Sequence, residues 1–136
     1  MTTPTNTDDI IDTRDLIEAL EERQDIVDAL AEAVESGDAA AIATEEDELA
    51  AWDEDNAGLV GFAAECECLS DYLYGETLVR DSSFATYAED MAKDIGAVDD
   101  DAKWPLMHID WEAAAEHLQS DYTSLEWGGV TYWGRA

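Results

Sequence analysis

Residues 12–36 read DTRDLIEALEERQDIVDALAEAVES, and this stretch decides the fold class of the N-terminal half. Its apolar residues recur at intervals of three, four or seven, which places them on one stripe of an α-helix at 100° per residue. Asp12 or Thr13 can cap the start, and Gly37 follows Ser36 as a C-terminal stop. We therefore predict a helix of about 24 residues, roughly 36 Å long at 1.5 Å per residue. The apolar stripe consists of Leu16, Leu20, Val27, Leu30, Ala31 and Val34.

The opposite face of this helix carries carboxylates, with Arg14 and Arg23 as its only cations. Side chains three or four residues apart on a helix lie about 5 to 6 Å from one another. This spacing is close to the distance of about 7 Å between successive phosphates on a DNA strand. We predict that the face binds a partner through Asp15, Glu18, Glu22, Asp25, Glu32 and Glu35. Glu21 and Asp28 widen it, and the alternative interpretation is a solvated face that serves only solubility.

The whole chain is strongly acidic. Its 136 residues, with a mass of 14.9 kDa, include 35 Asp and Glu against 6 Lys and Arg, so the formal net charge is −29. This charge equals that of roughly 15 base pairs of DNA, and it argues against direct binding to nucleic acid or an anionic membrane, because both are polyanions. Hydrophobic residues make up 46% of the chain and include five Trp, enough to build a core.

Several features favour a cytoplasmic protein. No apolar run approaches the roughly 18 residues that a membrane span needs. Residues 1–9, MTTPTNTDD, lack the basic start and the apolar stretch of a signal peptide. Cys66 and Cys68 lie two residues apart, an awkward spacing for a disulfide, so we expect reduced thiols.

The chain divides into three expected regions: a flexible terminus over residues 1–11, an acidic helical region over 12–70, and a small α+β domain over 71–136. In the second region Thr44 and the acids that follow it resemble a capping box, which predicts the start of a second helix. A break is expected near Asn56-Ala57-Gly58, after which the helix resumes from Leu59 to Leu69.

The third region mixes helix and strand signals. Aromatic and β-branched residues over 72–79 indicate a turn and a short extended piece. We predict helices over 84–95, with Tyr87, Ala88, Met91 and Ile95 inward, and from 111, capped by Asp110. Two β-rich runs around Gly128-Gly129 indicate a closing hairpin. The predicted class is α+β and mostly helical, with long acidic helices packed on or leading to this domain. Its core is expected to contain Trp104, Trp111, Tyr122, Trp127, Tyr132 and Trp133.

Metal sites receive little support. Asp53, Asp55 and Gly58 resemble the start of a calcium loop, but Ala57 and Ala64 stand where two ligands are needed. Cys66 and Cys68, with His108 and His117, offer atoms that bind zinc. Residues two apart on a helix point about 200° away from each other, so the cysteines would chelate only off a helix. We expect no metal and no cofactor.

Catalysis also lacks a motif. The sequence contains neither a Gly-x-Ser-x-Gly elbow nor a phosphate-binding glycine loop. We therefore expect a protein that is not an enzyme. Asp99, Asp100 and Asp101 form an acidic turn, which we predict to be a second partner-binding patch.

The C-terminal half resembles the last segment of ArdA-type antirestriction proteins. The similar stretches are WPL at 104–106, IDWEAAAEHL at 109–118, DY at 121–122 and GVTYW at 129–133, preceded by FATYAED at 84–90. Together they cover about residues 70–135. The resemblance implies an elongated acidic mimic of DNA, carried by a phage, plasmid or transposon, that occupies the DNA groove of type I restriction-modification enzymes. Where that family has further α/β modules, this chain has a helical region.

The leading hypothesis is an acidic mimic of DNA that inhibits a DNA-binding enzyme of bacterial defence, in the cytoplasm of a host cell. Its partner would be a DNA-binding protein with a basic groove. One alternative is a small acidic protein of a salt-loving organism. Another is a helical adaptor for a basic partner, in which the long helix is half of a coiled coil and could form a homodimer.

Overall fold

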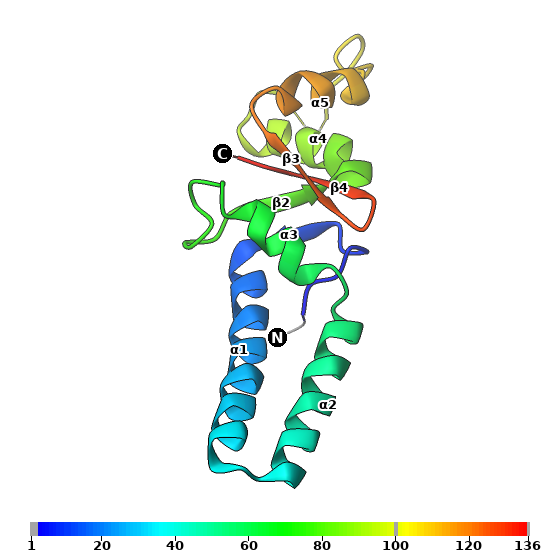
Figure 1. Cartoon of the computed structure of the whole chain (residues 1–136). Helices are drawn as coiled ribbons and strands as arrows, with labels where there is room; N and C mark the ends of the chain where they lie inside the picture. The colour runs from blue at the N-terminus through cyan, green and yellow to red at the C-terminus, as the bar shows by residue number, and fades with distance from the viewer. Residues whose placement is uncertain (1–2, 100, 136) are drawn as a thin grey trace.

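The sheet runs through the middle of the molecule, as the computed structural model in Figure 1 shows. The structure describes residues 3–99 and 101–135. In these residues it contains five α-helices and a four-stranded antiparallel sheet, so the predicted α+β class is confirmed. The strand order is β1-β2-β4-β3. Within the described part of the chain, no helix has both the length and the apolar character needed to cross a membrane.

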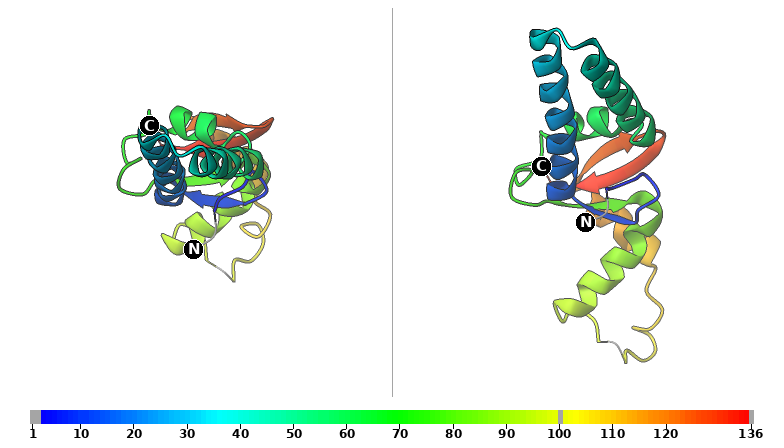
Figure 2. Two further views of the ribbon diagram at one scale, coloured as in Figure 1. Left: turned by 60° about the horizontal axis from the view of Figure 1, so that its bottom comes forward. Right: turned by 90° about the horizontal axis from the view of Figure 1, so that it is seen from below.

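Three layers follow one another along the long axis (Figures 1 and 2). An antiparallel pair of helices, α1 and α2, projects from one end, while α4 and α5 lie at the other end, beyond the sheet and α3. In chain order the elements are β1 (Ile10–Asp12), α1 (Thr13–Ser36), α2 (Ala39–Asp55), α3 (Leu59–Cys66), β2 (Thr77–Arg80), the 3-10 turn η1 (Asp81–Ser83), α4 (Phe84–Asp94), α5 (Trp111–Gln119), β3 (Thr123–Trp127) and β4 (Val130–Gly134).

Helix α1 occupies the stretch with which the sequence analysis began. The carboxylate of Asp12 accepts a hydrogen bond from the backbone N–H of Arg14 at its start, and Gly37 ends it with a φ of 72°. The apolar stripe is covered unevenly: Leu16 is fully buried, whereas Val34 is 59% exposed. Burial differs along the stripe because the distal half of α1 extends beyond the sheet and packs on α2.

Helix α2 begins six residues before the predicted start, since its cap is Asp38 and not Thr44. Asp38 caps it through a 3.2 Å hydrogen bond from the backbone N–H of Ala41 to the carboxylate. Thr44 lies inside the helix, where its hydroxyl donates to the carbonyl oxygen of Ala40. Alanine is the best helix former, so the run at 39–41 extends the helix back to the better-placed cap. The break expected near Asn56-Ala57-Gly58 is confirmed, since α2 ends at Asp55 and α3 begins at Leu59.

The described part of the N-terminal segment, residues 3–11, packs against the sheet and is not a flexible terminus. The hydroxyl of Tyr132 donates to the carbonyl oxygen of Asp8 at 2.6 Å, and Arg80 Nε donates to that of Asn6 at 3.2 Å. Ile11 pairs with Leu78 in the ladder between β1 and β2. The segment therefore supplies an edge strand that the sequence analysis did not anticipate.

The two faces of the sheet pack against different helices. Successive side chains of a strand point to opposite faces, so Leu78 and Val79 enter different clusters. Leu78 joins a core shared with α1, α2 and α3, while Val79 packs with Phe84 of α4 and Ala115 of α5. The shared core crosses the expected boundary at residue 70, so a separate C-terminal domain over 71–136 is a wrong division. The main cluster contains Ile11, Leu16, Ala19, Trp52, Leu59, Phe62, Ala63, Cys66, Leu69, Tyr72, Leu78, Leu125, Trp127 and Tyr132.

The aromatic residues divide between core and surface. Trp127 and Tyr132 are buried, and the Trp127 ring stacks on Phe62 with centroids 4.9 Å apart. Trp104 is 77% exposed and Ile95 is 73% exposed, so their predicted core positions are wrong. Both lie in or beside the segment between α4 and α5.

Candidate functional site

The helical pair over residues 13–55, which we call the arm, is the most acidic element of the molecule. It holds 16 Asp and Glu and two Arg. Arg14 Nη2 lies 2.6 Å from a carboxylate oxygen of Asp12, and Arg23 Nε lies 2.9 Å from one of Asp53. Both cations are thus engaged by carboxylates, and the arm displays a negative surface.

Five of the six predicted α1 carboxylates are exposed, and Asp15, the first, is half-buried near the sheet. All six lie on one side of α1, spread over about 160° of its circumference at 100° per residue. From Asp15 to Glu35 the helix rises about 30 Å at 1.5 Å per residue. That length matches roughly nine base pairs at 3.4 Å each. The exposed members are Glu18, Glu22, Asp25, Glu32 and Glu35.

Helix α2 contributes carboxylates that the sequence analysis did not assign to the site. The two helices lie side by side along the arm (Figure 2), so acids on α2 extend the same surface. Desolvation and the neighbouring Glu48 carboxylate raise the pKa of Glu45. The acidic residues at 45–55 were the available signal, but those at 45–47 were interpreted as part of a helix cap, and Asp53 and Asp55 were considered only for a calcium loop. The exposed α2 carboxylates are Glu46, Asp47, Glu48, Asp53, Glu54 and Asp55.

Arg23 and Asp53 join the two helices of the arm. Besides the 2.9 Å contact, Arg23 Nη2 donates to the second carboxylate oxygen at 3.4 Å. The guanidinium carbon lies 5.9 Å from the centroid of the buried Trp52 ring. The hydrogen bond from Arg23 lowers the pKa of Asp53 and raises that of Arg23. Asp53, considered above for a calcium loop, therefore has a structural role in the arm.

The second predicted patch does not join the first. Asp99 and Asp101 are exposed on the segment between α4 and α5, at the opposite end of the molecule from the arm (Figure 1). Asp100 lies outside the described residues. The structure therefore places Asp99 and Asp101 apart from the α1 carboxylates.

The cysteines lie in different environments. Cys66, the last residue of α3, is fully buried, whereas Cys68 in the following turn is exposed. Burial raises the pKa of the Cys66 thiol to about 12, with smaller contributions from Cys68 and Glu65. The Cys66 thiol is thus protonated at neutral pH. Over residues 3–99 and 101–135, no three His, Cys, Asp or Glu side chains gather as possible metal ligands.

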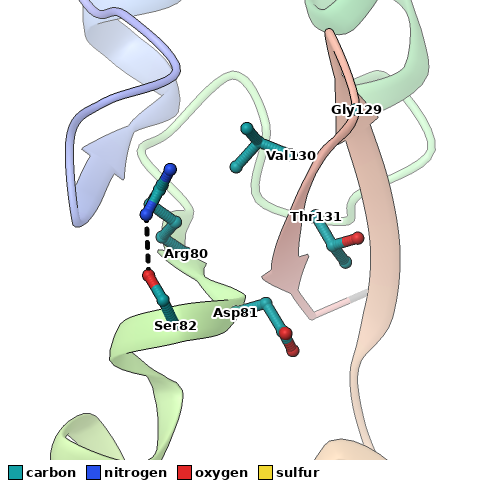
Figure 3. Close-up of a pocket in the computed structure, with 6 residues that line it drawn as sticks. All are labelled: Arg80, Asp81, Ser82, Gly129, Val130 and Thr131. Atoms are coloured by element: carbon teal, nitrogen blue, oxygen red, sulfur yellow. Dashed lines mark hydrogen bonds between the residues drawn. The ribbon is translucent and has the colours of Figure 1, made fainter.

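A small open pocket of about 240 Å³ lies where the β3–β4 turn approaches the end of β2 (Figure 3). Its one cation, Arg80, donates to the hydroxyl of Ser82 at 2.8 Å and to the backbone of Asn6. The carboxylate of Asp81 accepts a 2.9 Å hydrogen bond from Trp133 Nε1. The charged groups of this pocket are therefore paired with other parts of the chain.

Comparisons of the chain with protein-family models, with curated proteins and with solved structures found no match. Function is therefore argued from the residues and their geometry. The feature that stands out is the charge and shape of the arm.

Proposed function

We propose that the chain is a non-enzymatic, acidic mimic of DNA that binds the basic groove of a DNA-binding enzyme of bacterial defence and inhibits it. One observation carries the proposal. The arm projects from the sheet, exposes carboxylates along both helices and has its two arginines engaged by Asp12 and Asp53. The resemblance of residues 70–135 to ArdA-type proteins supports the same class and a cytoplasmic setting in the host of a mobile element.

Inhibition would come from carboxylates that take the place of phosphates. A groove lined with Lys and Arg attracts the arm at long range, and the steered encounter accelerates association. Added salt screens this attraction, so affinity falls as ionic strength rises. Duplex DNA competes for the same groove and displaces the protein.

Charge reversal on α1 tests the proposal against a type I restriction-modification enzyme. The variant Glu18→Lys, Glu22→Lys, Asp25→Lys, Glu32→Lys should abolish inhibition of DNA binding and cleavage, with an unchanged circular-dichroism spectrum. The matched control has the same net charge but reverses four exposed acids at the other end: Asp90→Lys, Asp94→Lys, Glu112→Lys, Glu116→Lys. This control should still inhibit. Full inhibition by a folded α1 variant, or equal loss in both variants, would contradict a role for the arm.

The target itself can be sought without assuming its identity. The protein, immobilised through a tag, is exposed to a bacterial lysate at low salt, and bound proteins are eluted with salt or with duplex DNA. We expect a DNA-binding enzyme that both treatments release. A bound protein released by salt but not by duplex DNA would contradict mimicry.

A second candidate is a small acidic protein adapted to a saline cytoplasm. It is favoured by exposed carboxylates on α4 and α5 as well as on the arm, and by the presence of only two Lys in the chain. Thermal unfolding separates the two: a halophilic protein unfolds as salt falls below roughly molar concentration, whereas a mimic stays folded in dilute buffer, where unscreened charge favours binding.

A further inference from the structure

An apolar groove separates α4 from α5 at the end of the molecule opposite the arm. Its volume is about 310 Å³. From α4 it is lined by residues at helical spacing, Ala88, Met91, Ala92 and Ile95. From the α5 side it is lined by Trp111, Ala114, His117, Leu118 and Asp121. The alanine side chains in the groove are small, so another chain can approach the two helices closely.

Further apolar side chains are exposed on the segment that connects the two helices. Trp104, Leu106 and Met107 are each more than half exposed, and Ile95 lines the groove itself. Large exposed apolar patches on a folded domain mark sites of interaction. Methionines such as Met91 and Met107 adapt to varied apolar partners.

The groove is a fixed feature, because the helices that form it are packed from beneath. Phe84 and Ala88 of α4 share a buried cluster with Ala115 of α5 and Val79 of the sheet. The Phe84 ring meets the edge of Tyr122 with centroids 5.2 Å apart. The two helices thus pack on each other and on the sheet beneath the groove.

The surroundings of the groove are negative. The basic side chains of the two helices are Lys93, which lies 3.5 Å from Glu89, and His117. Among the residues that line the groove, Asp121 is an acid, whereas Asp90, Asp94, Glu112 and Glu116 lie on the outer faces of the two helices. A second copy would bring two chains of net charge −29 together, whereas a cationic partner would be attracted to the negative charge of the molecule.

We propose that this groove binds an amphipathic helix of a partner protein, with apolar anchors facing the groove and Lys or Arg on its flanks. The 11 residues of α4 span about 16 Å, which accommodates roughly three turns of a bound helix with anchors at i, i+4 and i+7. This site goes beyond the proposed function and does not rest on it, because the arm lies at the other end of the molecule.

Two peptides of identical composition test the proposal on the full chain. One, of about 18 residues, places Leu on one helical face and Lys on the other. The second permutes the same residues so that no apolar face forms. At about 0.3 M NaCl, where general attraction to the acidic chain is screened, we expect the amphipathic peptide to bind at least about ten-fold more tightly by calorimetry. Its NMR shift changes should map to α4 and α5. Equal affinities, or shifts that map to the arm, would overturn the proposal.

A pair of variants locates the site. Ala114→Glu places a carboxylate on the groove, whereas Ala113→Glu places one on an exposed position of the same helix. The first should remove the preference for the amphipathic peptide, and the second should keep it. Loss of the preference in both, or in neither, would overturn the proposal. So would a dimer of the chain alone that Ala114→Glu dissociates, since a second copy would then occupy the groove. If Ala114→Glu fails to fold, the two peptides on the native chain still decide the question.

Discussion

Thr13 is a polar residue in the hydrophobic core. The sequence alone did not indicate its role there. Its side chain is fully buried, and its hydroxyl donates to the carbonyl oxygen of Tyr72 at 2.8 Å and accepts from the N–H of Glu76 at 2.8 Å. Its own N–H donates to the carbonyl oxygen of Glu76. Thr13 had been considered only as a cap, a role that Asp12 fills. Its true partners lie about 60 residues away, so no local pattern indicates them.

Thr13→Val keeps the shape of the side chain and removes two buried hydrogen bonds. We expect the free energy of unfolding to fall by about 2 kcal/mol, because two backbone groups lose their partner. Urea denaturation measures it, with Thr77→Val as the control at an exposed threonine. An equal effect of the two substitutions would contradict the structural role of Thr13.

Tyr132 and Cys66 predict a loss of stability in alkali. Burial raises the pKa of both groups to about 12. The folded state therefore holds them neutral where the unfolded chain ionises, above about pH 9 to 10. Their contribution to stability is fully present below that range and is lost as pH rises towards 12.

The substitution Tyr132→Phe tests this dependence. The variant should be less stable at pH 7, by about 1 kcal/mol for the lost hydrogen bond to Asp8. Its stability should also fall less steeply from pH 8 to 11, as measured by urea denaturation at each pH. Tyr74→Phe, at an exposed tyrosine, is the control. Parallel pH profiles for the native chain and Tyr132→Phe would refute the assignment.

At the scale of elements, the distal half of the arm is thinly packed. From Trp52 towards the tip of the arm, α1 and α2 pack only on each other. In this distal half one residue, Ala33, is buried. Like charges at helical spacing add repulsion of a few tenths of a kcal/mol per pair. We therefore expect the tip of the arm to open more readily than the sheet.

Arg23→Met should increase this opening. The variant removes the contact with Asp53, which is partly exposed and contributes about 1 kcal/mol or less. Hydrogen exchange of α1 and α2 amides should accelerate by up to about five-fold, while the sheet amides keep their rates. Added NaCl should slow exchange in the arm, because it screens the repulsion. Arg14→Met removes a contact with Asp12, two residues away, and should leave exchange in the distal arm unchanged. Equal acceleration of exchange by the two variants would contradict the role of the Arg23–Asp53 contact in holding α1 and α2 together.

Element boundaries were predictable where strong local signals exist. Gly37 and the Asn56-Ala57-Gly58 break gave helix ends, and Asp110 caps α5 through the N–H of Ala113. Strand β1 was missed because three residues are too short to show an alternating pattern. The start of α2 was missed because two residues, Asp38 and Thr44, can cap a helix here, and the alanines between them favour the earlier start.

At the scale of the whole molecule, the shared core predicts that residues 71–136 do not fold alone. Leu78, Leu125 and Tyr132 are covered by side chains from α1 and α3, and β2 pairs with β1. Without residues 1–70 these side chains would be exposed. We expect the fragment to give neither dispersed NMR signals nor a cooperative melt. A cooperative melt of the fragment would contradict this prediction, because it would show that residues 71–136 form a stable core without residues 1–70.

The expected boundary at residue 70 followed a change of composition, and composition does not report packing. Residues 1–70 are the more acidic part, but their exposed acids surround apolar residues that complete the sheet's core. The row of carboxylates on α1 could be predicted because a helix fixes the relative positions of its own residues. Their separation from Asp99 and Asp101 depended on how distant segments pack, which no local spacing encodes.

The placement of the arm and the α4–α5 groove at opposite ends has a thermodynamic consequence. The four-stranded sheet lies between them, so a ligand on one end does not contact the other end. Each dissociation constant should then be the same whether or not the other ligand is present. The molecule could thus bridge two proteins in a ternary complex that forms in any order.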